Sequence, residues 1–220
     1  MAIGRRALVG AVARRLPWGP IGATAAACAA FTWVRAVQVD AAELVTPLRL
    51  SAVLLAGAAA GCLEDPAEVL TATTPFGRLR RRALAVAMTA AIVTVVWFAV
   101  VGVASVLTSD PARGPGIPAG GLTIELIATC AAGWLLAAWI SASIGWRGSG
   151  MRAAIGVVIA TLLSLAQPDV MGWLWAMPGS GAAWTDAHEH WALVGLVACV
   201  GAAALSRDPA RRSVGWLRRA

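Results

Sequence analysis

Long apolar stretches alternate with short polar ones along most of the chain. Six of them approach the roughly 20 residues that a membrane-spanning helix needs. They are Trp18–Val37, Leu48–Leu63, Ala83–Leu107, Leu122–Ile144, Met151–Gln167 and Glu189–Leu205. The second, fifth and sixth are short, so five spans is the alternative to six. The pattern predicts an all-α integral membrane protein with a single transmembrane domain, residues 1–220.

The composition agrees with this class. Of the 220 residues, 59% are hydrophobic and 13% are charged, whereas soluble domains contain about 45–50% apolar and about 25% charged residues. So little charge does not cover a water-soluble surface, which excludes most soluble enzyme folds. The four cysteines lie in or near apolar stretches without a Cys-x-x-Cys pair, so we interpret them as small buried hydrophobic residues.

The basic residues indicate the orientation. All 18 are arginine, and with a cytoplasmic N-terminus only Arg35, Arg49 and Arg113 lie outside. The positive-inside rule favours this arrangement, with both termini and the basic tail 206–220 in the cytoplasm. We therefore assign the net charge of +7 to a membrane surface and not to nucleic acid. Arginine without lysine, with abundant Ala and Gly, is typical of a GC-rich bacterial genome, so we expect a bacterial plasma membrane.

Residues 1–16 are too short and too charged to cross the membrane. In a helix, Leu8, Val12 and Leu16 share one face while Arg6 and Arg14 point away. We expect a helix that lies in the membrane interface, with its arginines near anionic lipid head groups. A basic leader without regular structure is the alternative.

The cytoplasmic loop at residues 64–82, between the second and third stretches, carries signals for the start of a helix. Asp65 is a good N-cap, Pro66 suits the first helical position, and Glu68 lies three residues after the cap. These signals predict a short helix near Pro66–Thr73. An ordinary loop that only ends the neighbouring helices is the alternative.

The same segment carries a resemblance to a known family. Its pattern Asp-Pro-x-Glu-x-Leu-x-x-Thr-x-Pro, followed by several arginines, resembles the permease subunits of type-2 ABC exporters, the ABC-2 family. Those proteins are similar in having six spans, cytoplasmic termini and an interfacial N-terminal helix. The resemblance implies a coupling helix that contacts a separate ATPase subunit. The residues that it assigns to coupling are Asp65, Pro66, Glu68, Leu70, Thr74, Pro75 and Arg78.

The resemblance also implies a function. The chain would be a permease subunit of an ATP-driven exporter of an amphipathic or hydrophobic substrate, such as a drug, a peptide or a lipid-like molecule. Its partners would be an ABC ATPase, a second permease subunit (the same or a homologous chain) and membrane lipids. A P-loop requires a lysine, which the chain lacks, so ATP and Mg²⁺ would bind the partner and no cofactor would bind here. Trp97, Glu125 and Trp134 are the candidates for lining a substrate path or gate.

Two charged residues lie near the outer ends of apolar stretches. Glu125 is a functional candidate because carboxylates in membrane segments are costly. It also suits the start of a helix, where it complements the dipole and reaches water. Arg49 is interpreted as snorkelling to the surface, towards Asp40 or Glu43.

The outer segment at residues 168–190 is rich in tryptophan. Trp173, Trp175 and Trp184, with Trp191 beyond, fit an aromatic belt at the outer interface. Because the segment is apolar but short and contains Pro178, we expect a re-entrant or surface-lying hairpin. A simple interfacial anchor is the alternative.

Three alternative functions are weaker. Asp186, His188, Glu189 and His190 contain metal-ligand types, but the two histidines diverge on a helix. Asp186 as N-cap of the sixth span explains them, so no metal is expected. Ser180 in Gly-Ser-Gly suggests a rhomboid-like protease, but the histidines are expected in the outer interface, and we expect no catalytic residue. A non-transport scaffold or sensor subunit is the remaining alternative.

Overall fold

A computed structural model describes residues 2–64, 78–109, 116–145, 147–167 and 172–207. All regular secondary structure within these ranges is helical, as the sequence predicts. Five helical segments are long and apolar enough to cross a membrane. The first, Val45–Leu63, consists of α3 (Val45–Ala60) and the 3₁₀ turn η1 (Gly61–Leu63). The other four are α5 (Arg78–Leu107), α6 (Ala119–Ser143), α7 (Ser149–Ala166) and α9 (Ala182–Leu205). Two further helices, α1 (Ala2–Arg15) and α2 (Trp18–Ala36), precede them.

The first predicted span corresponds to α2. This helix has 19 residues, but its composition does not place it among the five segments that are apolar enough to cross a membrane. Length and composition therefore support five membrane spans directly, and a sixth span depends on α2.

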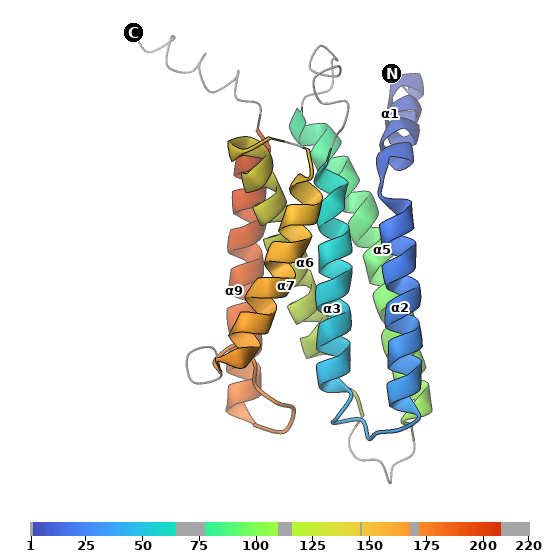
Figure 1. Cartoon of the computed structure of the whole chain (residues 1–220), viewed down its shortest axis with the longest axis vertical. Coiled ribbons are helices and arrows are strands. Elements are labelled where there is room, and N and C mark those ends of the chain that lie inside the picture. Colours follow the sequence, from blue (N-terminus) through green and yellow to red (C-terminus); the bar gives the residue numbers. More distant parts are fainter. Residues whose placement is uncertain (1, 65–77, 110–115, 146, 168–171, 208–220) are drawn as a thin grey trace.

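The helices form an antiparallel bundle in which α2, α5 and α7 run one way and α3, α6 and α9 run the other (Figure 1). Most described arginines gather at one end, which we call the arginine-rich end. They are Arg14, Arg15, Arg78, Arg80, Arg81, Arg82, Arg147, Arg152 and Arg207. The opposite end, which we call the aromatic end, carries Trp173, Trp175, Trp184 and Trp191.

The centre of the bundle is α3. About 72% of its span is buried, against 22% of α9. Small residues let α7 approach it closely: a Cβ on Gly57 would lie 3.4 Å from Cβ of Ala154, and one on Gly150 would lie 2.5 Å from Cα of Gly61. The Gly57-x-x-x-Gly61 spacing therefore serves packing of helices within the chain.

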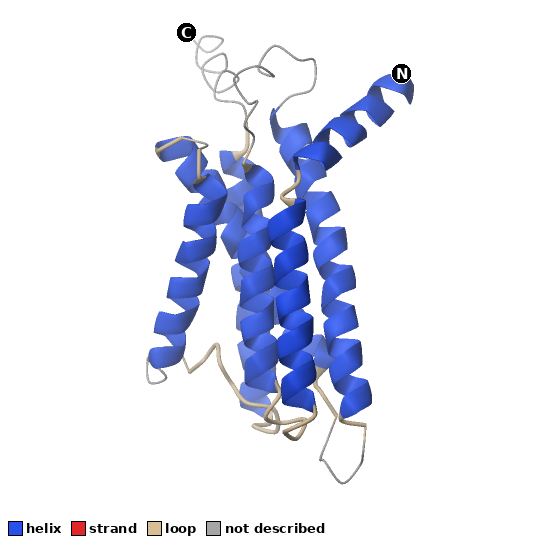
Figure 2. Ribbon diagram, turned by 45° about the vertical axis from the view of Figure 1, so that its right-hand side comes forward, coloured by secondary structure: helices blue, strands red, loops and turns tan. Residues whose placement is uncertain are grey.

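Helix α1 confirms the prediction of an N-terminal helix. Val12 and Leu16 are buried and belong to a cluster with Leu63, Ala85 and Ile140. Figure 2 shows α1 leaning away from the axis of the bundle. A helix directed this way is compatible with the interface, and its position relative to lipid stays a prediction.

The start of α9 differs from the prediction. The sixth span was expected to begin at Glu189 with Asp186 as its N-cap, but the N-cap is Gly181 and Asp186 lies inside the helix. Gly181 has a φ of 62°, a conformation that favours glycine. The first two turns of α9 contain buried residues, Ala187 and His188, so packing extends the helix beyond its apolar stretch.

Candidate functional site

The aromatic end contains a buried ion pair between two helices. Both α3 and α6 begin at this end, so Arg49 and Glu125, each a short distance inside its helix, lie at the same depth. Nε of Arg49 donates to Oε2 of Glu125 at 2.8 Å, and Nη2 donates to Oε1 at 2.7 Å. The residues are only 5% and 2% exposed. A buried two-point pair of this kind is both strong and directional.

This pair corrects the interpretation of Arg49. The side chain does not extend to the surface towards Asp40 or Glu43, both of which are exposed. Burial removes water from the guanidinium, and the only way to keep its charge without a large cost is to pair it with a carboxylate. Glu125, which faces Arg49 from α6, provides that carboxylate.

Arg49 also fixes the segment that precedes α9, residues 172–181. Its Nη2 donates to the carbonyl of Ala176 at 2.8 Å, and Nη1 lies 3.9 Å from the sulfur of Met177. The guanidinium carbon lies 5.2 Å from the ring centre of Trp175 and 5.8 Å from that of Trp184. Cation–π attraction therefore adds to the hydrogen bonds.

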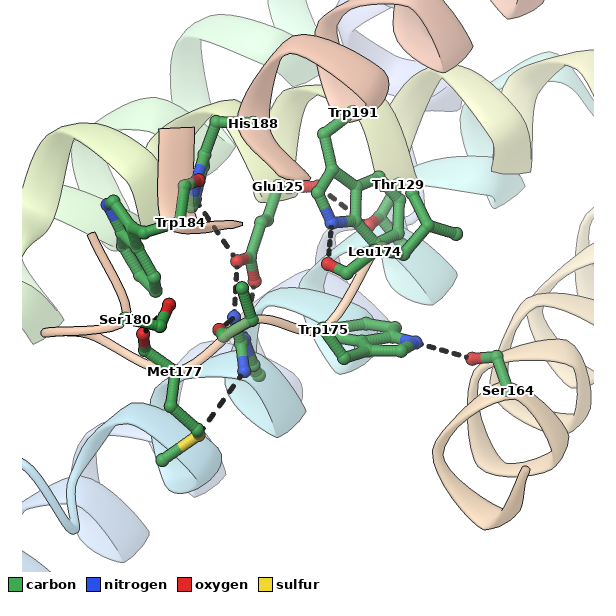
Figure 3. A network of polar contacts seen from close by, with 12 residues as sticks. Glu125, Thr129, Ser164, Leu174, Trp175, Met177, Ser180, Trp184, His188 and Trp191 are labelled. Carbon is green, nitrogen blue, oxygen red and sulfur yellow. Dashed lines mark hydrogen bonds and ion pairs between the residues drawn. The ribbon is translucent and has the colours of Figure 1, made fainter. Parts of the chain in front are cut away.

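His188 on α9 completes the cluster. Its Nδ1 lies 2.6 Å from the carbonyl oxygen of Trp184, and its Nε2 lies 3.3 Å from Oε1 of Glu125. Figure 3 shows the imidazole and the carboxylate directed towards one another beside Trp184. A Cβ on Gly121 would lie 2.5 Å from Nε2 of His188, so α6 needs glycine where α9 crosses it.

Indole groups tie the 172–181 segment to two helices. Nε1 of Trp175 donates to Oγ of Ser164 on α7 at 3.0 Å, and Nε1 of Trp191 on α9 donates to the carbonyl of Leu174 at 2.7 Å (Figure 3). Trp173 is half exposed, but Trp191 is buried. The predicted aromatic belt is therefore in part a set of internal hydrogen bonds, and its depth in the membrane stays a prediction.

The other two candidates for a path or gate lie inside the bundle. Trp97 is fully buried and its Nε1 donates to Oγ1 of Thr123 at 2.9 Å. Trp134 is partly buried and donates to the carbonyl of Ala59 at 3.2 Å. Both indoles join α6 to a neighbouring helix. Their role in a path stays a prediction, and of the three candidates only Glu125 belongs to the charged cluster.

A second polar cluster lies at the arginine-rich end. Oγ of Ser141 accepts hydrogen bonds from Nη2 of Arg82 at 2.8 Å and of Arg78 at 3.3 Å, which joins the start of α5 to the end of α6. The backbone N–H of Gly148 donates to Oε1 of Glu64 at 2.6 Å, which joins η1 to the start of α7. Of the coupling residues, Arg78 begins α5. The others lie outside the described residues: Asp65, Pro66, Glu68, Leu70, Thr74 and Pro75.

The residues considered for metal binding or hydrolysis have other contacts. His188 faces Glu125, whereas His190 packs edge-on against Trp173 with ring centres 5.0 Å apart. Within the described part of the chain, no group of three or more His, Cys, Asp or Glu side chains is arranged to hold a metal. Ser180 is exposed and its hydroxyl donates to the carbonyl of Met177 at 2.7 Å.

Sequence reasoning identified Glu125 but missed its partners. The signal was present: two opposite charges, Arg49 and Glu125, each lie near the outer end of an apolar stretch. His188 gave no such signal because it precedes the apolar part of α9.

Comparisons with protein-family models, with curated proteins and with solved structures found no match for this chain. The class of the protein is therefore defined by its architecture alone. It is an all-α protein in which five helical segments are long and apolar enough to suit a multi-pass membrane protein.

Proposed function

We propose that the chain is a permease, the membrane-spanning subunit of an ATP-driven exporter whose ATPase is a separate polypeptide. The observation that carries this proposal is that described residues on either side of the sequence-predicted coupling helix, Glu64 and Arg82, bond to α7 and α6. Glu64 before the segment bonds to Gly148 at the start of α7. Arg82 after it bonds to Ser141 near the end of α6. A displacement of the segment would therefore act on both helices.

We infer that α2 is the sixth span. It lies antiparallel to α3 (Figure 1), and its 19 residues approach the membrane thickness. Arg14 and Arg15 immediately precede it, at the end where the other arginine clusters lie. Under the positive-inside rule this end faces the cytoplasm, and so does the 65–77 segment.

An apolar groove supports a hydrophobic or amphipathic substrate. It has a volume of about 270 Å³ and runs between α2, α3 and α7, lined in part by Cys28, Phe31, Leu50, Leu54, Val158 and Leu162. A groove of this kind offers little to a strongly charged solute, whose desolvation would be costly.

Co-purification tests the proposal directly. A tagged chain, extracted in mild detergent from its native host, should retain an ATPase with a Walker A motif, and this complex should hydrolyse ATP. A chain that associates with no ATPase would contradict the exporter assignment and favour a scaffold or sensor subunit.

The coupling role has its own test. Replacing Glu68 and Leu70 by alanine should abolish transport-linked ATP hydrolysis while membrane insertion stays normal. Asp40→Ala with Glu43→Ala, two exposed positions at the aromatic end, is the matched control and should leave the activity unchanged. Normal export by the Glu68→Ala and Leu70→Ala variant would refute the coupling role.

Orientation is tested in intact cells. An epitope inserted at Ala72 should be protected from antibody until the membrane is permeabilised. Labelling from outside would reverse the orientation and remove the basis for contact with a cytoplasmic ATPase.

A further inference from the structure

The ring of His188 lies between two oxygen atoms. The Trp184 carbonyl oxygen is 2.6 Å from Nδ1, and Oε1 of Glu125 is 3.3 Å from Nε2. The side chain is only 8% exposed. Among the described residues Nε2 has no partner of hydrogen-bond geometry, and Oε1 of Glu125 lies within ion-pair distance of it. The carboxylate of Glu125 is thus the group that this nitrogen faces.

A neutral imidazole leaves one of these two oxygens facing a bare ring nitrogen. It carries one N–H and one bare nitrogen. With the proton on Nδ1, the lone pair of Nε2 faces a carboxylate oxygen. With the proton on Nε2, the lone pair of Nδ1 faces the Trp184 carbonyl. A protonated ring carries N–H on both nitrogens, and so presents a hydrogen to each oxygen.

We propose that Glu125 and His188 form a buried proton-binding site, in which one proton is held between Oε1 and Nε2 and keeps the 172–181 segment closed over the ends of α3 and α6. The ligand is the proton itself. This inference is independent of the exporter assignment, because it uses only contacts within the aromatic end.

The charges around the site are few. Arg49 faces it from α3 and Glu125 from α6, and the 172–181 segment contains no ionisable side chain. On α9 itself Asp186, Glu189 and His190 are exposed. With the proton bound, the cluster carries one net positive charge. The carbonyls of Ala176 and Trp184 and the two indole faces near Arg49 offset that charge.

Loss of the proton acts on the 172–181 segment through Trp184 and Arg49. The His188 lone pair and the Glu125 carboxylate would repel each other, which separates α9 from α6 at this end. Trp184 moves with α9, and the contacts that Arg49 makes with Ala176 and Trp184 weaken together. Since the closed arrangement binds the proton, low pH stabilises it, and this contribution disappears as the pH rises.

Histidine NMR tests the proton itself. The chain has two histidines, so His190→Ala leaves His188 as the single ring in protein labelled with ¹⁵N-histidine. In nanodiscs at about pH 7, both ring nitrogens should carry hydrogen. A spectrum with one bare nitrogen would overturn the proposal, whichever tautomer it showed.

Hydrogen exchange tests the consequence. Between about pH 6 and about pH 9, exchange of the 172–181 backbone, corrected for its intrinsic pH dependence, should rise about tenfold in the wild type. His188→Gln keeps N–H donors but cannot titrate, and its corrected exchange should be independent of pH. His190→Ala is the control and should behave as the wild type. The same rise in His188→Gln, or no rise in the wild type, would contradict the role of the proton.

Discussion

The two ends of the bundle differ in how deeply their charged side chains are buried. At the arginine-rich end most guanidinium groups are exposed or partly exposed, and the buried one, Arg82, has the hydroxyl of Ser141 among its partners. At the aromatic end Arg49 is buried against Glu125 with His188 beside them. The first arrangement leaves most of the charge accessible at the end of the bundle. The second ties three helices and a connecting segment into one unit, and so depends on every partner.

The largest expected loss of stability follows from removing the carboxylate that pairs with Arg49. Glu125→Ala leaves Arg49 buried without a counter-charge, and should destabilise the protein by about 3–5 kcal/mol. Unfolding in mixed micelles measures the loss. Asp186→Ala, an exposed carboxylate at the same end, is the control and should change stability little.

The pair can also be replaced as a unit. Arg49→Met combined with Glu125→Leu should recover most of the stability lost in Glu125→Ala, because the guanidinium that lost its counter-charge is removed as well. An equal loss in the double variant would mean that packing, and not charge, dominates at this end.

The next effect concerns close packing at the arginine-rich end. A methyl group at Gly150 would lie 2.5 Å from the backbone of Gly61, so α7 must move. Gly150→Ala should cost about 1–3 kcal/mol in the same unfolding assay. Gly102→Ala meets no atom within 4 Å and should be neutral or slightly stabilising. Equal stabilities of the two variants would contradict the close contact of α7 with η1.

A smaller effect is expected for the hydroxyl that Arg82 and Arg78 share. Ser141→Ala removes the acceptor, and interhelical hydrogen bonds in membrane proteins contribute about 1 kcal/mol or less. Ser143→Ala is matched in sequence, but its hydroxyl bonds within its own helix, to Trp139. We expect a measurable loss of stability only for Ser141→Ala; equal losses would argue that the Arg82–Ser141 contact contributes nothing.

The smallest expected loss of stability concerns the hydrogen bond between Trp175 and Ser164 at the aromatic end. Trp175→Phe keeps an aromatic ring near Arg49 but loses the N–H bond to Ser164. We expect a loss of about 0.5–1 kcal/mol, together with faster hydrogen exchange in the 172–181 segment. Trp139→Phe, an exposed indole on α6, should leave that exchange unchanged.

The predicted ends of the spans were more accurate than the predicted starts. The third and sixth stretches were expected to end at Leu107 and Leu205, where α5 and α9 do end. Their starts were expected at Ala83 and Glu189, but α5 begins at Arg78 and α9 at Ala182. Both helices continue through charged or polar residues that hydropathy leaves out, because backbone hydrogen bonding and packing hold those turns.

The candidate site was predictable only in part. Glu125 stood out because a carboxylate in an apolar stretch is costly, and this reasoning needs no partner. The pairing of Glu125 with Arg49 could not be predicted in this way. It depends on α3 and α6 starting at the same end of the bundle with the two side chains facing each other. The hydrophobic periodicity of either helix does not show which residue of the other helix it will face.

The sequence by itself determined the helical class, the apolar segments that suit a membrane and the gathering of arginine at one end. These properties are local, because hydropathy and charge are summed over about 20 neighbouring residues. Only the tertiary structure decided that Arg49, Glu125 and His188 meet, that α7 approaches η1 through Gly150, and that α9 begins at Ala182. Those features depend on the rotation and depth of one helix relative to another, which packing sets once the helices come together.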